Sequence, residues 1–313
     1  MLTFVIRRLG AMIIVMLLVA SLAFIIARVV PGDPAAVMLG DMATPADVDK
    51  LRSELGLNRP LAIQFVIFLR NILAGNLGRS IFFDQPVAQA MLDRAELTLL
   101  LTALAVSIAM AIGVPIGIVA AVQRGKVSDQ ALTAGAMLAA SLPSFWIGLT
   151  LIQYLSVDLR WFPVAGYGPP GSSLLERLQY LILPSFALGI PSSALIMRFT
   201  RSSMLDVLGE DYIRTARAKG LAEDRGILKH ALRNAAIPIL TVIGLTITVL
   251  MGGAIVTETV FALPGVGKLI VQAVLYRDYP VIQGALLVVS GIYVLINLAI
   301  DLLYAVLDPR IRY

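Results

Sequence analysis

Six long apolar stretches dominate this sequence and limit what it can fold into. They cover residues 9–26, 96–122, 131–157, 180–199, 236–256 and 280–307. About 17–25 apolar residues in an α-helix are enough to cross the hydrocarbon core of a bilayer. Charged residues make up only 14% of the chain, whereas a soluble domain carries about 25%. The sequence therefore predicts an all-α integral membrane protein with six transmembrane helices.

The first stretch has a competing interpretation, because Arg7 and Arg8 precede it as they would in a signal peptide. The apolar region of a signal peptide is usually about 7–15 residues long and ends at a site with small residues. The stretch 9–26 is longer, and no such site follows it. We therefore expect a transmembrane helix here.

The distribution of basic residues predicts the orientation of the spans. Lysine and arginine concentrate in the short cytoplasmic loops of membrane proteins. The two termini, the turn 123–126 and the loop 198–234 hold 14 of the 25 basic residues, and the short loops of the opposite side hold four. We expect a multi-pass protein of the plasma (inner) membrane with a cytoplasmic N-terminus and a cytoplasmic C-terminus. Membrane lipid is expected to surround its spans.

Residues 31–95 are mostly polar and are predicted to lie outside. A short helix is expected at 44–55, with Thr44 as its N-cap and Gly56 at its end. A second is expected at 61–73, which is apolar but short for a span. These features predict a soluble subdomain on the outer membrane surface.

The longest polar interruption in the second half of the chain is residues 211–234. Acidic residues open its first helix and basic residues close it, as the helix dipole favours. Gly220 fits the position where a helix ends in a left-handed conformation. Residues 202–237 contain six basic and five acidic side chains. A lipid-binding tract would carry one sign of charge, so this segment is better suited to docking on another protein.

The run RSSMLDVLGEDYIRTARAKGL, followed by KHALRNAAIP, resembles the cytoplasmic EAA loop of bacterial ABC importer permeases. Ala216 and Gly220 match the general EAA-x3-G pattern, while Arg214 and Thr215 depart from it as in the dipeptide/oligopeptide/nickel branch, first-permease type. In that family the loop forms a coupling helix that inserts into a groove of the ATP-binding subunit. The resemblance implies this role for Glu210, Asp211, Arg214, Thr215, Ala216, Arg217 and Gly220.

The resemblance also implies an architecture and a set of partners. Residues 96–307 would form a type I permease core, after an N-terminal helix with an outer segment at 1–95 and before a cytoplasmic tail at 308–313. Such a subunit pairs with a second homologous permease and two ATP-binding subunits. A substrate-binding protein delivers the cargo, and the complex works by alternating access.

The sequence offers little chemistry of its own. It has no phosphate-binding loop of the G-x4-GK[ST] type and no HExxH or GxSxG motif. It has no cysteine and one histidine, which disfavours a metal site. The net charge of +5 is divided by topology and does not indicate nucleic-acid binding. We expect no catalytic residue and no cofactor in this chain, with ATP and Mg²⁺ bound by the partner subunits.

Several polar residues fall within or beside the spans. Asp301 is expected near the inner end of the last span, paired with an arginine of the cytoplasmic loop. Thr257 and Glu258 begin a run that resembles the family pattern TET-x-F-x-x-PG-x-G and are expected in a structural corner that packs on the partner permease. The candidate residues for lining the transport pathway are Ser141, Ser144, Gln153, Thr248 and Asn297.

The substrate class follows from the resemblance alone. The family carries dipeptides, longer peptides, glutathione, nickel chelates and some oligosaccharides, and the runs GEDYIRTARAKGL and RDYPVIQG look most like those of peptide permeases. Peptides are therefore expected. A proton- or ion-coupled secondary transporter would need inverted repeats and charges deep in several spans, and neither is evident. A membrane sensor or scaffold would use the loop only for docking, and co-purification with a substrate-stimulated ATPase would separate it from a permease.

Overall fold

The computed structural model describes residues 2–29, 36, 39, 44–54, 56–219 and 231–307, and helices dominate these residues. The helices are α1 (Leu2–Val29), α3 (Pro45–Glu54), α4 (Leu61–Leu73), α5 (Val87–Val122), α6 (Val127–Ser141), α7 (Ser144–Leu151), a π-helix (Ile152–Asp158), α8 (Leu174–Leu208), α9 (Asp211–Ala218), α11 (Leu232–Val260), α12 (Val266–Leu275) and α13 (Tyr279–Leu307). The only β-type pairing in this part of the chain is an isolated bridge between Arg79 and Pro86. The predicted all-α class is confirmed.

The chain divides into two compact units. The first unit contains residues 1–95 and 269–298, and the second contains residues 96–268 and 299–312. The boundaries fall inside α5, α12 and α13, so these helices contribute to both units.

Five helices in the described residues are long and apolar enough to cross a membrane. Their spanning segments lie at Ile6–Ile26, Val87–Val122, Leu174–Leu208, Leu232–Val260 and Tyr279–Leu303. A bent helix pair, Val127–Ser141 with Ser144–Asp158, brings the number to six if the pair is one span. Every predicted span therefore coincides with a helix or with this pair.

Two spans have ends that the hydropathy pattern placed wrongly. The second was expected to begin at residue 96, but α5 begins at Val87. Charged residues mark the end of a membrane span, but they do not end a helix that continues into water. The fifth was expected to end at 256, but α11 continues to Val260 and includes Glu258. The third span was expected to be interrupted at residues 142–144, where Pro143 permits a kink, and the chain turns there by 92°.

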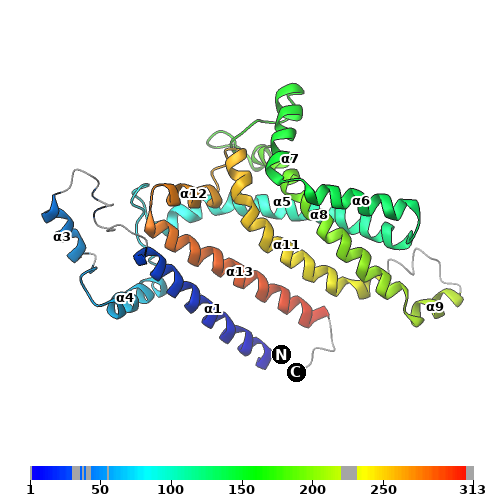
Figure 1. Ribbon diagram of the computed structural model, residues 1–313, viewed down its shortest axis with the longest axis horizontal. Helices are drawn as coiled ribbons and strands as arrows, with labels where there is room; N and C mark the ends of the chain where they lie inside the picture. The colour runs from blue at the N-terminus through cyan, green and yellow to red at the C-terminus, as the bar shows by residue number, and fades with distance from the viewer. Residues whose placement is uncertain are drawn as a thin grey trace. The chain divides into compact units, whose positions relative to one another are not determined.

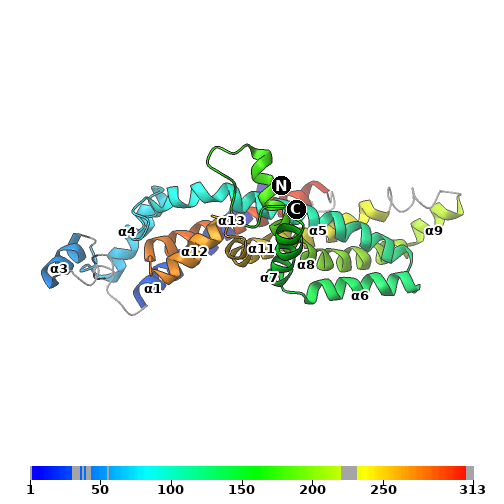
Figure 2. The ribbon, with the colours of Figure 1, turned by 90° about the horizontal axis from the view of Figure 1, so that it is seen from above.

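Helix α8 lies at the centre of the second unit, where it packs against α6, α7 and α11 (Figures 1 and 2). It also packs closely on the part of α5 that belongs to this unit. A Cβ added at Gly113 or Gly117 of α5 would lie 2.6 and 2.7 Å from the carbonyl oxygens of Ser193 and Met197. A Cβ at Gly189 of α8 would lie 2.8 Å from the carbonyl oxygen of Ala105. Only glycine permits the two backbones to approach this closely.

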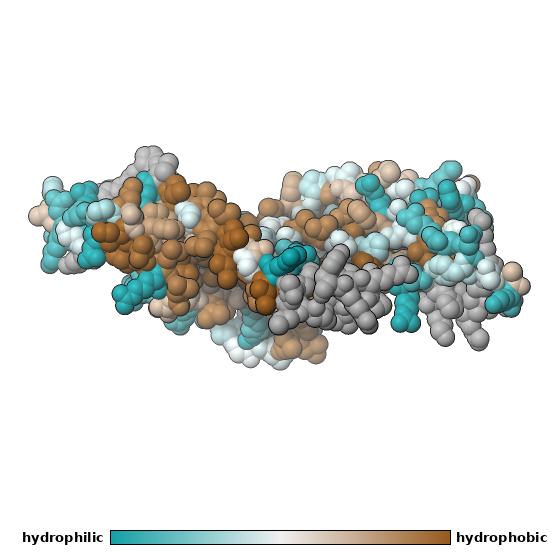
Figure 3. All heavy atoms as spheres, turned by 90° about the horizontal axis from the view of Figure 1, so that it is seen from below, coloured by the Kyte–Doolittle hydropathy of each residue, from teal (hydrophilic) through white to brown (hydrophobic). Residues whose placement is uncertain are grey.

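The first unit contains the two short helices expected in residues 31–95. The structure confirms the cap of α3, because the amide of Asp47 donates to Thr44 Oγ1 at 3.3 Å and the amide of Thr44 donates to Asp47 Oδ2 at 3.2 Å. The hydroxyl of Thr44 also donates to Asp47 Oδ2 at 2.6 Å, and this bond, together with that of the Thr44 amide, lowers the pKa of Asp47 below its ordinary value. Gly56 has φ of +67°, as its place after the helix requires. Apolar side chains gather on the surface formed by α1 and α4 (Figure 3).

Candidate functional site

The short helix α9 (Asp211–Ala218) connects α8 to α11 in the second unit. Helix α8 ends at Leu208, and the amide of Gly209 donates to the carbonyl oxygen of Leu205 at 3.2 Å. The amide of Glu210 then donates to the carbonyl oxygen of Val207, so the chain turns tightly before α9 begins. The first of the two helices expected in the polar segment is confirmed. The second, beyond Gly220, lies outside the described residues.

Two contacts hold α9 against the rest of the unit. Ile213 is only 2% exposed and belongs to the apolar core that also contains Met204, Ala231 and Ala235. The side-chain amide of Asn234, in the first turn of α11, donates to the hydroxyl oxygen of Tyr212 at 2.7 Å. Both ends of the segment are therefore fixed to the unit through α9.

The opposite side of α9 is open. Thr215 lies two residues after Ile213, a rotation of about 200° around the helix axis. Asp211, Thr215 and Ala218 share this side and are exposed. The hydroxyl of Thr215 donates to the carbonyl oxygen of Asp211 at 2.9 Å, so its hydrogen bond is made within the helix. We name these three residues the open face of α9.

The other predicted coupling residues are only partly described. Glu210 is exposed in the turn before α9. Arg214, Ala216 and Arg217 lie in α9, but their side chains fall outside the description, as does the whole of Gly220. Ala218 was missed by the sequence reasoning, and its rotation relative to a buried Ile213 is the signal that could have found it.

A bidentate ion pair stabilises the same end of the second unit. Arg201 of α8 donates from Nε to Asp129 Oδ1 at 2.7 Å and from Nη2 to Asp129 Oδ2 at 2.8 Å. Asp129, in the first turn of α6, also accepts from the amide of Gly125 at 3.0 Å. These bonds fix the α5–α6 turn to α8 about two turns before the end of α8, and this turn and α9 lie at one end of the unit (Figures 1 and 2).

At the end of α11, Glu258 is completely buried inside this chain. Its carboxylate accepts from the hydroxyl of Thr98 of α5 at 2.6 Å and from the amide of Lys268 in α12 at 2.9 Å. Thr98 in turn accepts from the amide of Val266 at 2.9 Å. Glu258 thus supplies negative charge and an acceptor to the N-terminus of α12, where free amides and the helix dipole favour both. The expected corner exists, but its carboxylate contacts this chain and is not open to a partner.

The glycines after Glu258 make room for this carboxylate. A Cβ at Gly265 would overlap the carboxyl group of Glu258, and a Cβ at Gly267 would lie 2.6 Å from Cα of Ile255. The spacing of Glu258, Gly265 and Gly267 therefore has a steric cause.

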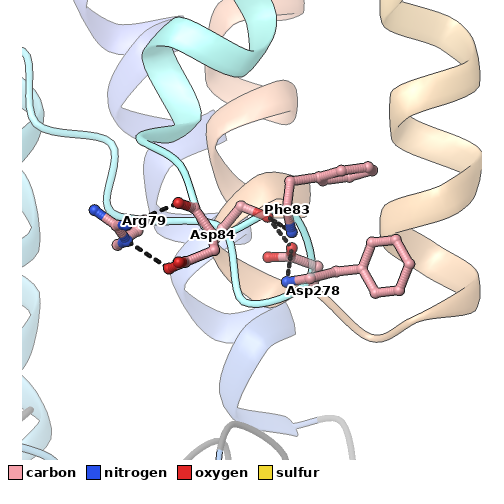
Figure 4. A network of polar contacts seen from close by, with 6 residues as sticks. Arg79, Phe83, Asp84 and Asp278 are labelled. Atoms are coloured by element: carbon pink, nitrogen blue, oxygen red, sulfur yellow. Dashed lines mark hydrogen bonds and ion pairs between the residues drawn. The ribbon is translucent and has the colours of Figure 1, made fainter.

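A second polar cluster belongs to the first unit (Figure 4). Asp278 is buried and accepts from the hydroxyl of Ser80 at 2.5 Å and from the amides of Phe82 and Val281 at 3.1 and 3.3 Å. On the same loop, Arg79 Nε donates to Asp84 Oδ1 at 2.9 Å. This bond, with the charge of the guanidinium, lowers the pKa of the Asp84 carboxyl below its ordinary value. The cluster fixes the loop 79–84 to the segment between α12 and α13.

Comparison with known proteins decides the family. Residues 113–313 match the family model described as the inner membrane component of binding-protein-dependent transport systems. Residues 1–102 match the model for the N-terminal region of such membrane components. The chain belongs to this permease family. It is thus an ABC importer permease of the peptide family, a multi-pass protein of the inner membrane.

Relatives of this permease match along its whole length. It is 45% identical over 310 residues to a probable peptide ABC transporter permease protein of Sinorhizobium fredii, with 99% of each chain covered. It is 44% identical over 309 residues to a putative peptide transport system permease protein of Brucella abortus, with 99% of this chain and 98% of the relative covered. It is 43% identical over 313 residues to the glutathione transport system permease protein GsiC of Salmonella typhi, with 100% of both covered.

A solved structure shares the fold of the permease. A chain of the MetNI methionine ABC transporter, in an inward-facing conformation, superposes with a TM-score of 0.57 at 19% identity. The match covers 69% of this permease and 95% of that chain. It supports the type I importer fold that the sequence predicted.

The predicted pathway residues of the permease differ in their surroundings. Asn297 belongs to the first unit and the other four to the second. Ser141, Gln153 and Asn297 are exposed in the single chain, and Ser144 and Thr248 are half-buried. Gln153 donates to Asp158 at 3.0 Å, while Ser141 and Thr248 donate to carbonyl oxygens of their own helices. Their pathway role and the expected pairing of Asp301 stay predictions.

The ion pair between Asp129 and Arg201 gives a testable prediction about the stability of the permease. We expect Asp129→Asn to lower the melting temperature of the purified permease more than Asp49→Ala, measured by a fluorescence thermal-shift assay in detergent. Asp129, whose side chain is only 6% exposed, forms a bidentate bond with Arg201, whereas the Arg52–Asp49 pair leaves 72% of the Asp49 side chain exposed to solvent. Exposed pairs contribute little because water screens them. Equal melting temperatures for the two variants would contradict the structural role of Asp129.

Proposed function

We propose that this permease translocates di- or oligopeptides that a binding protein delivers. The observation that carries the proposal is full-length similarity, at 44–45% identity, to relatives named as peptide permeases. Homology at this level over whole chains supports conservation of the machinery, although the pocket itself is set by fewer residues. The permease forms one half of the pathway, and a second homologous permease forms the other half.

Energy comes from two ATP-binding subunits that dock on the cytoplasmic side. The proposed docking element is α9, with the residues around it from Glu210 to Gly220. Two features support this role: the open face of α9, and the anchors at Ile213 and Tyr212 on the other side. A force on the open face would reach α8 and α11 directly, because α9 lies between them in the chain. Alternating access would follow from movement of these helices.

Glutathione is the second candidate substrate. The relative named as a glutathione permease matches all 313 residues at 43% identity, almost as well as the peptide relatives. Glutathione is itself a small peptide, so both candidates require a polar path for a charged, flexible solute.

The proposal is tested by uptake into proteoliposomes that contain both permeases, both ATP-binding subunits and the binding protein. Labelled dipeptides and oligopeptides of mixed sequence are compared with labelled glutathione. We expect ATP-dependent uptake of the peptides, with unlabelled peptide competing. Proteoliposomes with this permease alone provide the background, because the sequence has no phosphate-binding loop. Uptake of glutathione with no uptake of other peptides would replace the first candidate by the second, and uptake of neither would refute both.

The orientation gives an independent prediction. A reporter inserted after Arg225 is expected in the cytoplasm and one after Asp49 on the outer side, because basic residues concentrate on the side of Arg225. The measurement is the accessibility of each reporter to a membrane-impermeant reagent in intact spheroplasts and in lysed ones. Two reporters on the same side would contradict the proposed topology.

A further inference from the structure

Helix α4 (Leu61–Leu73) is apolar on every side although it is too short to span a membrane. Only Gln64, Arg70 and Asn71 of its thirteen residues are polar. A helix that is apolar all round is normally buried in a protein core or in lipid. None of the residues of α4 is buried in this chain.

One side of α4 packs on the end of the first span. The ring of Phe24 in α1 lies 5.2 Å from the ring of Phe65 and 5.6 Å from that of Phe68. Arg28 of α1 donates from Nε and Nη2 to the side-chain oxygen of Gln64 at 3.1 and 3.0 Å. The side-chain nitrogen of Gln64 donates to the carbonyl oxygens of Leu57 and Arg59. Both polar atoms of the Gln64 side chain are thus paired within the first unit.

These contacts fix the depth of α4. The apolar spanning segment of α1 is Ile6–Ile26, so Phe24 lies two residues before its end, about 3 Å along the helix axis. The side chain of Arg28 lies just beyond this end. Helix α4 therefore packs on α1 at the level where the hydrocarbon core of the membrane meets its headgroups.

The other side of α4 is apolar and uncovered. Ile63 is 47% exposed, Val66 is 64% and Leu73 is 88%. Arg70 lies seven residues after Ile63, four after Val66 and three before Leu73, so it projects from the middle of this side. Its guanidinium has no hydrogen-bond or ion-pair partner among the described residues. We name Ile63, Val66, Ile67, Arg70 and Leu73 the outer face of α4.

The outer face adjoins a surface that lipid must cover. Helix α1 is a membrane span whose side chains are mostly exposed in this chain, with Leu18 at 65% and Leu22 at 56%. Figure 3 shows apolar side chains over α1 and α4 together. If water covered the outer face of α4, a large apolar patch would be hydrated next to a membrane. Soluble proteins rarely expose apolar patches of this kind.

We propose that α4 is an interfacial membrane helix. Its apolar outer-face residues lie among the acyl chains of the leaflet at the C-terminal end of α1, and Arg70 extends from the middle of the face to lipid phosphates. Interfacial helices bury their apolar face about 5–10 Å into the boundary between headgroups and acyl chains. A long arginine side chain keeps its charge at the headgroups while its stem crosses apolar surroundings, and its guanidinium binds phosphate with two hydrogen bonds. For α4, this proposal differs from the expectation that residues 31–95 form a soluble subdomain on the outer membrane surface.

The absence of cysteine allows a direct test, because any cysteine introduced is the only one in this chain and can be labelled before the transporter is assembled. A nitroxide spin label is attached at Val66→Cys in the assembled transporter, reconstituted in phospholipid vesicles. Collision rates with oxygen, which partitions into lipid, and with a water-soluble nickel chelate are measured. Leu18→Cys in α1 is the reference for lipid, and Asp49→Cys in α3, which is exposed and polar, is the reference for water.

We expect the oxygen collision rate to exceed the nickel rate at Val66, as at Leu18, and the opposite order at Asp49. The excess at Val66 should be smaller than at Leu18, because an interfacial helix lies at shallower depth than the middle of a span. A label at Val66 that collides mainly with nickel would overturn the proposal and place α4 in water. A label shielded from both reagents would also overturn it and place another protein on this face.

Discussion

Replacing Thr215 by tryptophan is expected to abolish substrate-stimulated ATP hydrolysis and uptake by the reconstituted transporter. Thr215 is exposed at the middle of the open face of α9, opposite the buried Ile213. If α9 docks on the ATP-binding subunit as proposed, an indole there would hold the helix away from that subunit. A central contact of this kind contributes about 2–4 kcal/mol to docking, which corresponds to roughly a 30- to 700-fold loss of affinity.

The matched control is Ser53→Trp in α3. Ser53 is an exposed hydroxyl residue whose side chain donates to the carbonyl oxygen four positions earlier, as Thr215 does, but it lies in the other unit. We expect wild-type activity for this control, and membrane insertion and pairing with the second permease for both variants. If Thr215→Trp shows wild-type stimulation of ATP hydrolysis by substrate, α9 is not the coupling element.

Glu258→Leu is expected to prevent stable folding of the second unit. Leucine has about the right volume but accepts no hydrogen bond, so the hydroxyl of Thr98 and the amide of Lys268 would lose a buried acceptor. Removing one partner of a buried charged hydrogen-bond network costs about 3–5 kcal/mol. A typical domain is stable by only about 5–15 kcal/mol, so the chain should fail to accumulate in the membrane.

Gly265→Ala should act on the same cluster by a different route. Its methyl group would displace the Glu258 carboxylate, and such overpacking costs about 1–3 kcal/mol. Gly135→Ala in α6 is the matched control, since a Cβ at Gly135 has no atom within 4 Å. The measurements are membrane abundance and melting temperature in detergent. A wild-type melting temperature for Glu258→Leu would show that the carboxylate does not hold α5, α11 and α12 together.

Hydropathy predicted the ends of a helix well where the apolar run and the helix end at the same residues. The expected short helix at 61–73 is α4 residue for residue, because Pro60 and the Gly75 turn bound an apolar run on both sides. The start of α5 was misplaced by nine residues, since Asp93, Arg94 and Glu96 end an apolar run but are compatible with a helix in water. Pro143 marked the position of the break in the third span. The angle of that break depends on packing, which one sequence does not reveal.

The sequence also predicted only part of the candidate site. Acidic residues at the start of the segment, basic residues near the end of its first helix and Gly220 after them were enough to predict α9. The hydrogen bond from Thr98 to Glu258 joins residues 160 positions apart, and nothing local to either residue indicates the other. The pathway candidates were chosen by polarity within spans, and polarity alone does not distinguish a residue facing a channel from one bonded to its own helix, as Ser141 is.

The three glycine contacts between α5 and α8 reduce the number of independent motions available to the second unit. Gly113, Gly117 and Gly189 bring the two backbones together over several turns, and the nearest side chains, those of Ile108, Ile196 and Thr200, are β-branched and therefore stiff at χ1. Neither helix can rotate about its own axis without driving a carbonyl group into its neighbour. The two helices would therefore move together, and a displacement of α8 would carry with it the part of α5 from Ala105 to Gly117.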